Sequence, residues 1–238
     1  MLELIFFFLI IFLSNIIQEM TGFAGTVLAM PFSLTLVGAN IAKPVLNIVA
    51  LIVSLTVCIK YRKEIQLKEF LFMISFVLMG FILGFLIEKL PLNEKIILRI
   101  YGSIICVIAL LFFFIEFEKI PIPNIVLAII LIFAGVLHKL YISGGPLVVI
   151  YARKKFTNQA SFRANLSSMW VMLNLLLLGF QSQEGILTNT VALYSLIGCI
   201  ISIVSIILGI ILSKFINKKI FFKITCVLLL ISGIRLLF

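Results

Sequence analysis

The sequence predicts an all-α, polytopic membrane protein built from two inverted-topology repeats. Of its 238 residues, 63% are hydrophobic and 12% are charged, and the mean hydropathy is +1.33. Soluble domains are about 45–50% apolar and about 25% charged, so this composition excludes a soluble globular protein, and disordered chains are far less hydrophobic. Because a spanning helix needs about 20 apolar residues, the chain has room for roughly eight to ten helical segments and for no extramembrane domain.

Apolar segments separated by polar breaks follow one another along the whole chain. Their expected ranges are 2–20, 24–38, 41–60, 69–88, 95–117, 122–142, 145–153, 161–181, 188–213 and 219–238. The segments 24–38 and 145–153 are short, and each follows a glycine-rich break. Glycine weakens a helix, so we expect one helix to end and a new one to begin inside the membrane at each break. Non-helical backbone at that depth must be covered by protein or by a watery cavity.

The two breaks are in register, which indicates an internal duplication. An offset of 120 residues places Gly25 on Gly145, and an offset of 125 places Gly84 on Gly209. Paired interruptions of this kind are typical of transporters built from repeats. We therefore expect each repeat to contain a broken, re-entrant helical hairpin and three transmembrane helices. The first repeat is residues 1–118 (hairpin 2–38, helices 41–60, 69–88 and 95–117), and the second is residues 119–238 (hairpin 122–153, helices 161–181, 188–213 and 219–238).

The basic loops predict the orientation of the two halves. If each hairpin enters and leaves on one side, each half crosses three times and the second half is inverted. The basic loops 60–69, 153–163 and 213–223 then lie together on the cytoplasmic side, as the positive-inside rule requires, and both termini lie outside. The outer side receives 181–190, which has no Lys or Arg, and the mixed-charge loop 88–99. The net charge of +10 therefore mainly reflects topology and not a nucleic-acid partner.

The two breaks also predict a binding site for an anion. The second hairpin arms begin near Gly25 and Gly145, and each helix N-terminus carries roughly half a positive charge together with unpaired N–H donors. The alternative is that the glycines only allow tight helix packing. The residues of the breaks that we expect to bind substrate are Gly22, Gly25, Thr26, Ser143, Gly144, Gly145 and Pro146.

Titratable residues precede both breaks at equivalent positions. Glu19 precedes the first break, and His138 and Lys139 precede the second. A charge inside a membrane costs at least ~2.5 kcal/mol, so such residues are usually paired or functional. One hypothesis is an ion pair between Glu19 and Lys139. In a functional version Lys139 adds charge to the anion site and His138 or Glu19 carries a coupling proton; the alternative is snorkelling to the interface.

Further polar residues follow each hairpin. Lys43 and Arg163 lie near the starts of the next helices, on opposite faces, where they can gather anions at two mouths or act as interface anchors. We expect Arg163, Asn165 and Asn47 to complete the binding residues. Trp170 is expected to be a packing or interfacial aromatic residue.

Other chemistries lack the residues that they need. The single histidine lies five residues before Ser143 on the same element, which excludes a serine protease, and Glu19 alone qualifies as an intramembrane carboxylate for a metal carrier. The four cysteines lie in apolar stretches without a CxxC motif. We expect no catalytic residues, no metal site, no cofactor and no nucleic-acid partner.

The motifs at the two breaks resemble those of a known family. The run Gly22-Phe23-Ala24-Gly25-Thr26, followed by Pro31, resembles the first glycine-rich motif of the sulfite exporter TauE/SafE family. The run Ser143-Gly144-Gly145-Pro146-Leu147, followed by Tyr151 and by Phe162-Arg163-Ala164, resembles the second. The chain departs from the family pattern at Ala24 and Thr26, where glycines are common, and at Ile142, where a glycine is usual. The resemblance implies a transporter of small, often sulfur-containing anions in a prokaryotic inner membrane.

Together these features predict a secondary transporter that moves a small anion such as sulfite, thiosulfate or an organosulfonate by alternating access. An inside-negative potential drives anions outward by about 2.3 kcal/mol per charge per 100 mV, which favours an exporter, whereas accumulation inside needs protons or sodium. The alternatives are a permease for another small organic anion or an amino-acid-like solute, and a membrane assembly subunit that does not transport.

Overall fold

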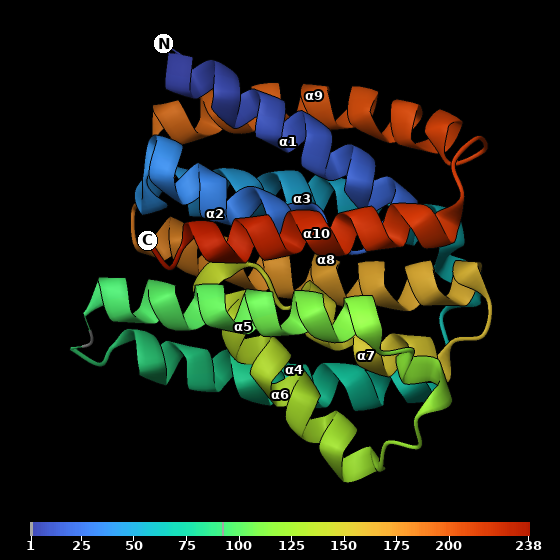
Figure 1. The fold of residues 1–238 in the computed structure, drawn as a ribbon. Coiled ribbons are helices and arrows are strands. Elements are labelled where there is room, and N and C mark those ends of the chain that lie inside the picture. The colour runs from blue at the N-terminus through green and yellow to red at the C-terminus, as the bar shows by residue number, and fades with distance from the viewer. Residues whose placement is uncertain (1, 92) are drawn as a thin grey trace.

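The chain folds into a bundle of α-helices in the computed structural model, which describes residues 2–91 and 93–238 (Figure 1). Each apolar segment expected from the sequence contains one helix. The helices are α1 (Leu2–Thr21), α2 (Gly25–Val37), α3 (Ala39–Tyr61), α4 (Leu67–Glu88), α5 (Glu94–Phe114), α6 (Asn124–Tyr141), α7 (Gly145–Lys155), α8 (Gln159–Gln183), α9 (Asn189–Leu212) and α10 (Lys218–Arg235), with short 3-10 turns at Arg62–Glu64 and Phe117–Lys119.

Seven of the described helices are long and apolar enough to cross a membrane, so the chain is a multi-pass membrane protein. They are α1, α4, α5, α6, α8, α9 and α3 together with its following turn. The first hairpin arms α1 and α6 therefore have spanning length, whereas α2 and α7 have 13 and 11 residues. The helix expected over 219–238 is not among the seven, because four of the 18 residues of α10 are basic.

Apart from the helix ends at the two breaks, the helix ends gather at two ends of the bundle (Figure 1). The N-terminal and C-terminal ends of the chain lie at the same end, here called the terminal end (Figure 1). The connections 62–66, 156–158 and 213–217 lie at the opposite end, here called the basic end, because the helices on either side of them carry many Lys and Arg residues (Figure 1). The three basic loops thus lie on one side of the molecule, as the hairpin topology requires.

The interior of the bundle lies along α3 and α8, which pack against each other over much of their length. The other principal contacts join α4 to α6, α1 to α9 and α5 to α10. Large apolar side chains remain exposed on the outer helices, as expected for surfaces that face lipid; examples are Leu71, Ile82, Ile100, Leu196 and Ile207. Several polar side chains of α3 and α8 are buried in this interior, among them Asn47, Ser54, Ser167 and Asn174.

Candidate functional site

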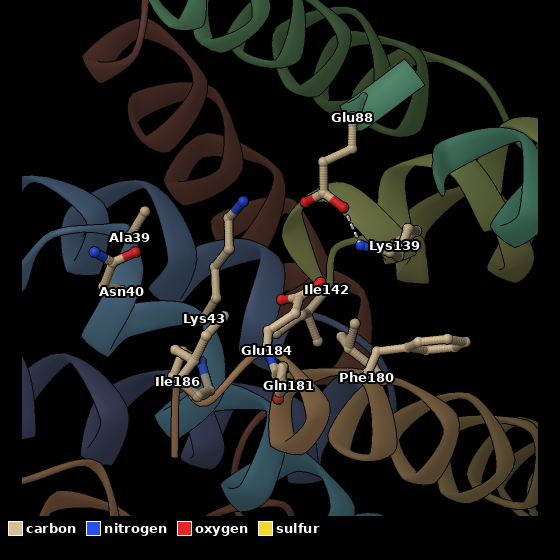
Figure 2. Close-up of a pocket in the computed structure, with 12 residues that line it drawn as sticks. Ala39, Asn40, Lys43, Glu88, Lys139, Ile142, Phe180, Gln181, Glu184 and Ile186 are labelled. Atoms are coloured by element: carbon tan, nitrogen blue, oxygen red, sulfur yellow. Dashed lines mark hydrogen bonds and ion pairs between the residues drawn. The ribbon is translucent and has the colours of Figure 1, made fainter. Parts of the chain in front are cut away.

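A row of cavities runs through the bundle from the terminal end to the basic end. The first, here called the terminal vestibule, has a volume of about 140 Å³ (Figure 2). It is lined by the start of α3, the ends of α4 and α8 and the break after α6, and its charged lining residues are Lys43, Glu88, Lys139 and Glu184. The terminal vestibule therefore presents two cations and two anions to the terminal side.

The second cavity, here called the central cavity, lies where the two helix breaks meet. It measures about 20 Å³ and is lined from the breaks by Phe23, Thr26, Ile142 and Gly145. A Cβ atom at Gly145 would lie 2.9 Å from the carbonyl oxygen of Phe23, so the start of α7 packs directly on the backbone of the first break. The two hairpin tips thus lie against each other, as expected from the sequence.

Two further cavities, here called the Arg163 cavities, continue the row to the basic end. The inner one measures about 20 Å³ and shares Gln18, Ser54 and Trp170 with the central cavity. The outer one measures about 130 Å³ and is lined by residues of the basic end, including Ser213. Because Arg163 lines both, its guanidinium lies at the basic mouth of the row.

A polar cluster from α6 and α8 lines the central cavity. His138 Nε2 lies 3.0 Å from Asn174 Oδ1, and the imidazole ring stacks on Trp170 with a centroid separation of 5.0 Å. Since an amide oxygen only accepts, His138 Nε2 donates in this arrangement. His138 Nδ1 and Asn174 Nδ2 are fully buried without a hydrogen-bond partner. Buried polar atoms are normally paired with protein, water or ligand, and these two atoms lie beside the central cavity.

The glycines at the first break allow a close approach that side chains would prevent. Gly22 has a φ of +87°, which L side chains rarely adopt. A Cβ at Gly25 would lie 1.8 Å from Gln18 Oε1, so the absence of a side chain lets the Gln18 amide lie against the start of α2. Gln18 in turn lines both the central cavity and the inner Arg163 cavity.

The charged residues beside the breaks form two separate ion pairs, so the expected pair between Glu19 and Lys139 is wrong. Lys139 pairs with Glu88 of α4 (Figure 2). Its ammonium group also lies 4.1 Å from the centre of the Phe85 ring. Glu19 accepts a hydrogen bond of 2.5 Å from Arg163, which also donates to the Glu19 carbonyl oxygen. The reason is packing: α6 lies along α4, and the two residues line cavities at different ends of the row.

Several residues expected at the site have structural partners instead. Ser143 donates to the Tyr141 carbonyl oxygen at 2.8 Å and accepts from Tyr101 Oη at 2.5 Å, so it ties the second break to α5. Asn165 accepts from the Gln66 N–H at 3.1 Å and donates to the Ser161 carbonyl oxygen.

Asn47 also serves as a link between helices. It donates to the Asn174 carbonyl oxygen at 3.2 Å and to Gln181 Oε1 at 3.0 Å, which joins α3 to α8. Gly144 allows the tight α6–α7 turn, because a Cβ there would lie 2.3 Å from the Ala134 carbonyl oxygen, and Pro146 is buried in the first turn of α7.

Sequence reasoning did not assign Trp170, Asn174 or Gln18 to the binding site. A signal for the α8 residues was nevertheless present. Polar or aromatic side chains recur along this helix at intervals of three, four or seven residues, which places them on one face. The stripe comprises Arg163, Ser167, Trp170, Asn174 and Gln181, and each lines at least one cavity of the row.

The comparisons with known proteins agree with the motifs at the breaks. The profile of the sulfite exporter TauE/SafE family matches residues 7–236. Comparisons with curated proteins and with solved structures found no match. The described residues contain no group of three or more His, Cys, Asp or Glu able to hold a metal ion. Because the family match covers nearly the whole chain, the protein is a membrane transporter that belongs to the sulfite exporter TauE/SafE family.

Proposed function

We propose that this protein exports a small, sulfur-containing anion such as sulfite, thiosulfate or an organosulfonate across a prokaryotic inner membrane by alternating access. The observation that carries this proposal is the row of cavities, which reaches both ends of the bundle and narrows at the two helix breaks. In alternating access only one mouth is open to the central site at a time, and the narrow centre separates the two mouths in this conformation.

The chemistry of the central cavity suits an anion. Both α2 and α7 begin beside it, and their first N–H groups have no partner within the helix. The unpaired Asn174 amide and the Thr26 hydroxyl add donors from α8 and α2. In this proposal Gly25 and Gly145 let the anion approach the backbone, and Lys43 and Arg163 attract it at the two mouths.

The packing supports the proposed inverted repeat. Under the 120- and 125-residue offsets, α1 corresponds to α6 and α4 to α9, and the contacts α1–α9 and α6–α4 are equivalent. A Cβ at Gly84 would lie 2.7 Å from Lys139 Cβ, and one at Gly209 would lie 2.8 Å from Glu19 Cβ. A glycine of each half thus accommodates the charged residue of a hairpin, in the same geometry.

Proton coupling is proposed through Glu19, with His138 as the second carrier. Glu19 faces the inner Arg163 cavity and shares Arg163 with any anion that enters from the basic end. An anion that binds the guanidinium competes with the Glu19 carboxylate for it, which makes Glu19 the first candidate to carry a proton. His138 Nδ1, unpaired beside the central cavity, is able to accept that proton at the next position in the row.

A second candidate substrate class is an amino-acid-like zwitterion. The terminal vestibule favours it, because Glu88 and Glu184 lie in the same cavity as the two lysines. A solute with both an ammonium and an acidic group would find partners for both there.

The deciding experiment is flux of labelled sulfite and thiosulfate in proteoliposomes, with glycine as the zwitterion. We expect flux of a sulfur anion and an anion-dependent rise in the thermal stability of the purified protein. Gly145→Leu should abolish that rise. Asn174→Ala should reduce flux about tenfold or more, since a hydrogen bond to a charged group contributes about 1.5–3 kcal/mol.

Ser195→Ala provides the matched control. Ser195 is a buried, unpaired serine of α9 outside the row of cavities, and its loss should leave the flux unchanged. Flux of glycine alone would favour the zwitterion. Absence of flux and of any thermal response to all three solutes would contradict transport and favour an assembly subunit.

A further inference from the structure

The backbone of Ile142 adopts a conformation that is costly for its side chain. Its φ is 55° and its ψ is 29°, and no other non-glycine residue of the described chain has a positive φ. A β-branched residue is a rare occupant of this left-handed region, where helices usually end at a glycine. The turn is fixed by hydrogen bonds, because the Ile142 N–H donates to the His138 carbonyl oxygen at 2.8 Å.

A glycine would make the same turn without strain, so the isoleucine side chain needs a separate explanation. The side chain is 2% exposed, and Ile142 is the one residue that lines both the terminal vestibule and the central cavity. Figure 2 shows it between the Glu88–Lys139 pair and Gln181, at the inner limit of the terminal vestibule. Strain retained at such a position suggests a function for the group that causes it.

We infer that the Ile142 side chain is an apolar plug between the terminal vestibule and the central cavity, and that it limits the size of the solute that passes. This inference rests on the proposed transport function. An anion at the plug loses contact with water while the hydrocarbon side chain offers no hydrogen bond, so passage requires the plug to move. The left-handed backbone is the higher-energy local state for an isoleucine, so a change to an ordinary helical conformation would relieve the strain and reorient the side chain.

Access to the central cavity tests the plug directly. In a variant that lacks the four native cysteines, Thr26→Cys places a thiol in the central cavity and Asn40→Cys places one in the terminal vestibule. A membrane-impermeant methanethiosulfonate reagent is added to sealed membranes on the side where the termini lie. We expect Ile142→Ala and Ile142→Gly to increase the labelling rate of the Thr26→Cys thiol several-fold, whereas Ile142→Val leaves it close to the native rate.

The vestibule thiol is the control, and its labelling rate should be the same in all four backgrounds. Ile142→Gly also removes the backbone strain, so it should fold even if Ile142→Ala does not. Equal labelling of the Thr26→Cys thiol in the native and Ile142→Gly backgrounds would overturn the inference.

Flux gives the second measurement. Ile142→Gly should raise the flux of sulfoacetate relative to that of sulfite, and an unchanged ratio would overturn the size limit. Absence of all flux in the native protein would contradict the proposed function, but the labelling rates would still decide whether Ile142 closes the junction.

Discussion

The hairpins α1–α2 and α6–α7 have the same layout but opposite chemistry. Each ends its first helix beside the central cavity and begins its second with a glycine. The first break uses Gly22 at a positive φ and carries an acidic residue that pairs with α8. The second uses Ile142 and carries a basic residue that pairs with α4. Similar backbones therefore serve different ends of the row: one hairpin holds the guanidinium at the basic mouth, and the other forms the inner limit of the vestibule.

The largest expected difference between the hairpins is in their ion pairs. In the α1 pair, the Arg163 and Glu19 side chains are 13% and 9% exposed, whereas in the α6 pair the Lys139 side chain is 4% exposed and Glu88 is 39% exposed. Arg163→Ala leaves a buried carboxylate without a partner and should lower the free energy of unfolding by about 3 kcal/mol. Lys139→Ala leaves a carboxylate that water reaches and should cost less than about 1 kcal/mol.

Thermal unfolding of the detergent-purified variants measures this difference. Adding Glu19→Gln to Arg163→Ala should recover part of the loss, because it removes the unpaired charge. Equal losses in the two single variants would mean that burial does not distinguish the pairs.

A smaller difference is expected at the two glycines that begin the second arms. A Cβ at Gly145 meets a backbone oxygen of the other hairpin, whereas a Cβ at Gly25 meets the end of the flexible Gln18 side chain. Gly145→Ala should therefore cost about 2 kcal/mol, within the usual range for overpacking, and Gly25→Ala should cost less. Thermal unfolding and sulfite flux of the two variants test the order; a greater loss in Gly25→Ala would show that the contact between the breaks is not the tighter one.

The smallest difference between the two hairpins is expected at Gly84 and Gly209, the glycines that pack against the charged residues Lys139 and Glu19. Gly84 and Gly209 each face the stem of such a residue at nearly the same Cβ distance. Gly84→Ala and Gly209→Ala should have similar costs, each about 1–3 kcal/mol, because in both an added Cβ would lie closer than 3.0 Å to the neighbouring Cβ and the helices have to move apart. Gly179→Ala is the control, since nothing lies within 4 Å of its added Cβ and alanine favours a helix. Losses that differ widely between Gly84→Ala and Gly209→Ala would weaken the proposed repeat.

The sequence predicts the helices and the breaks well, because both depend on local chemistry. The starts of α2 and α7 follow from Gly25 and from Gly145-Pro146, and the basic connections follow from charge. The partners of Glu19 and Lys139 could not be predicted in this way. These partners depend on which helices pack together and on how far along the bundle axis each residue lies. A periodic sequence pattern encodes neither the helix pairing nor this relative position. For the same reason the sequence predicts only a packing or interfacial role for Trp170, since its stacking on His138 joins two helices that are distant in the sequence.

One consequence concerns the link between the interior of the bundle and the water-exposed connection at the basic end. Asn165 holds the backbone of the 62–66 connection from α8, two residues from Arg163. Any shift of the Arg163 side chain that moves this turn of α8 also pulls on the connection. If the proposed anion binds at Arg163, a fluorophore on this connection would report its binding from outside the bilayer.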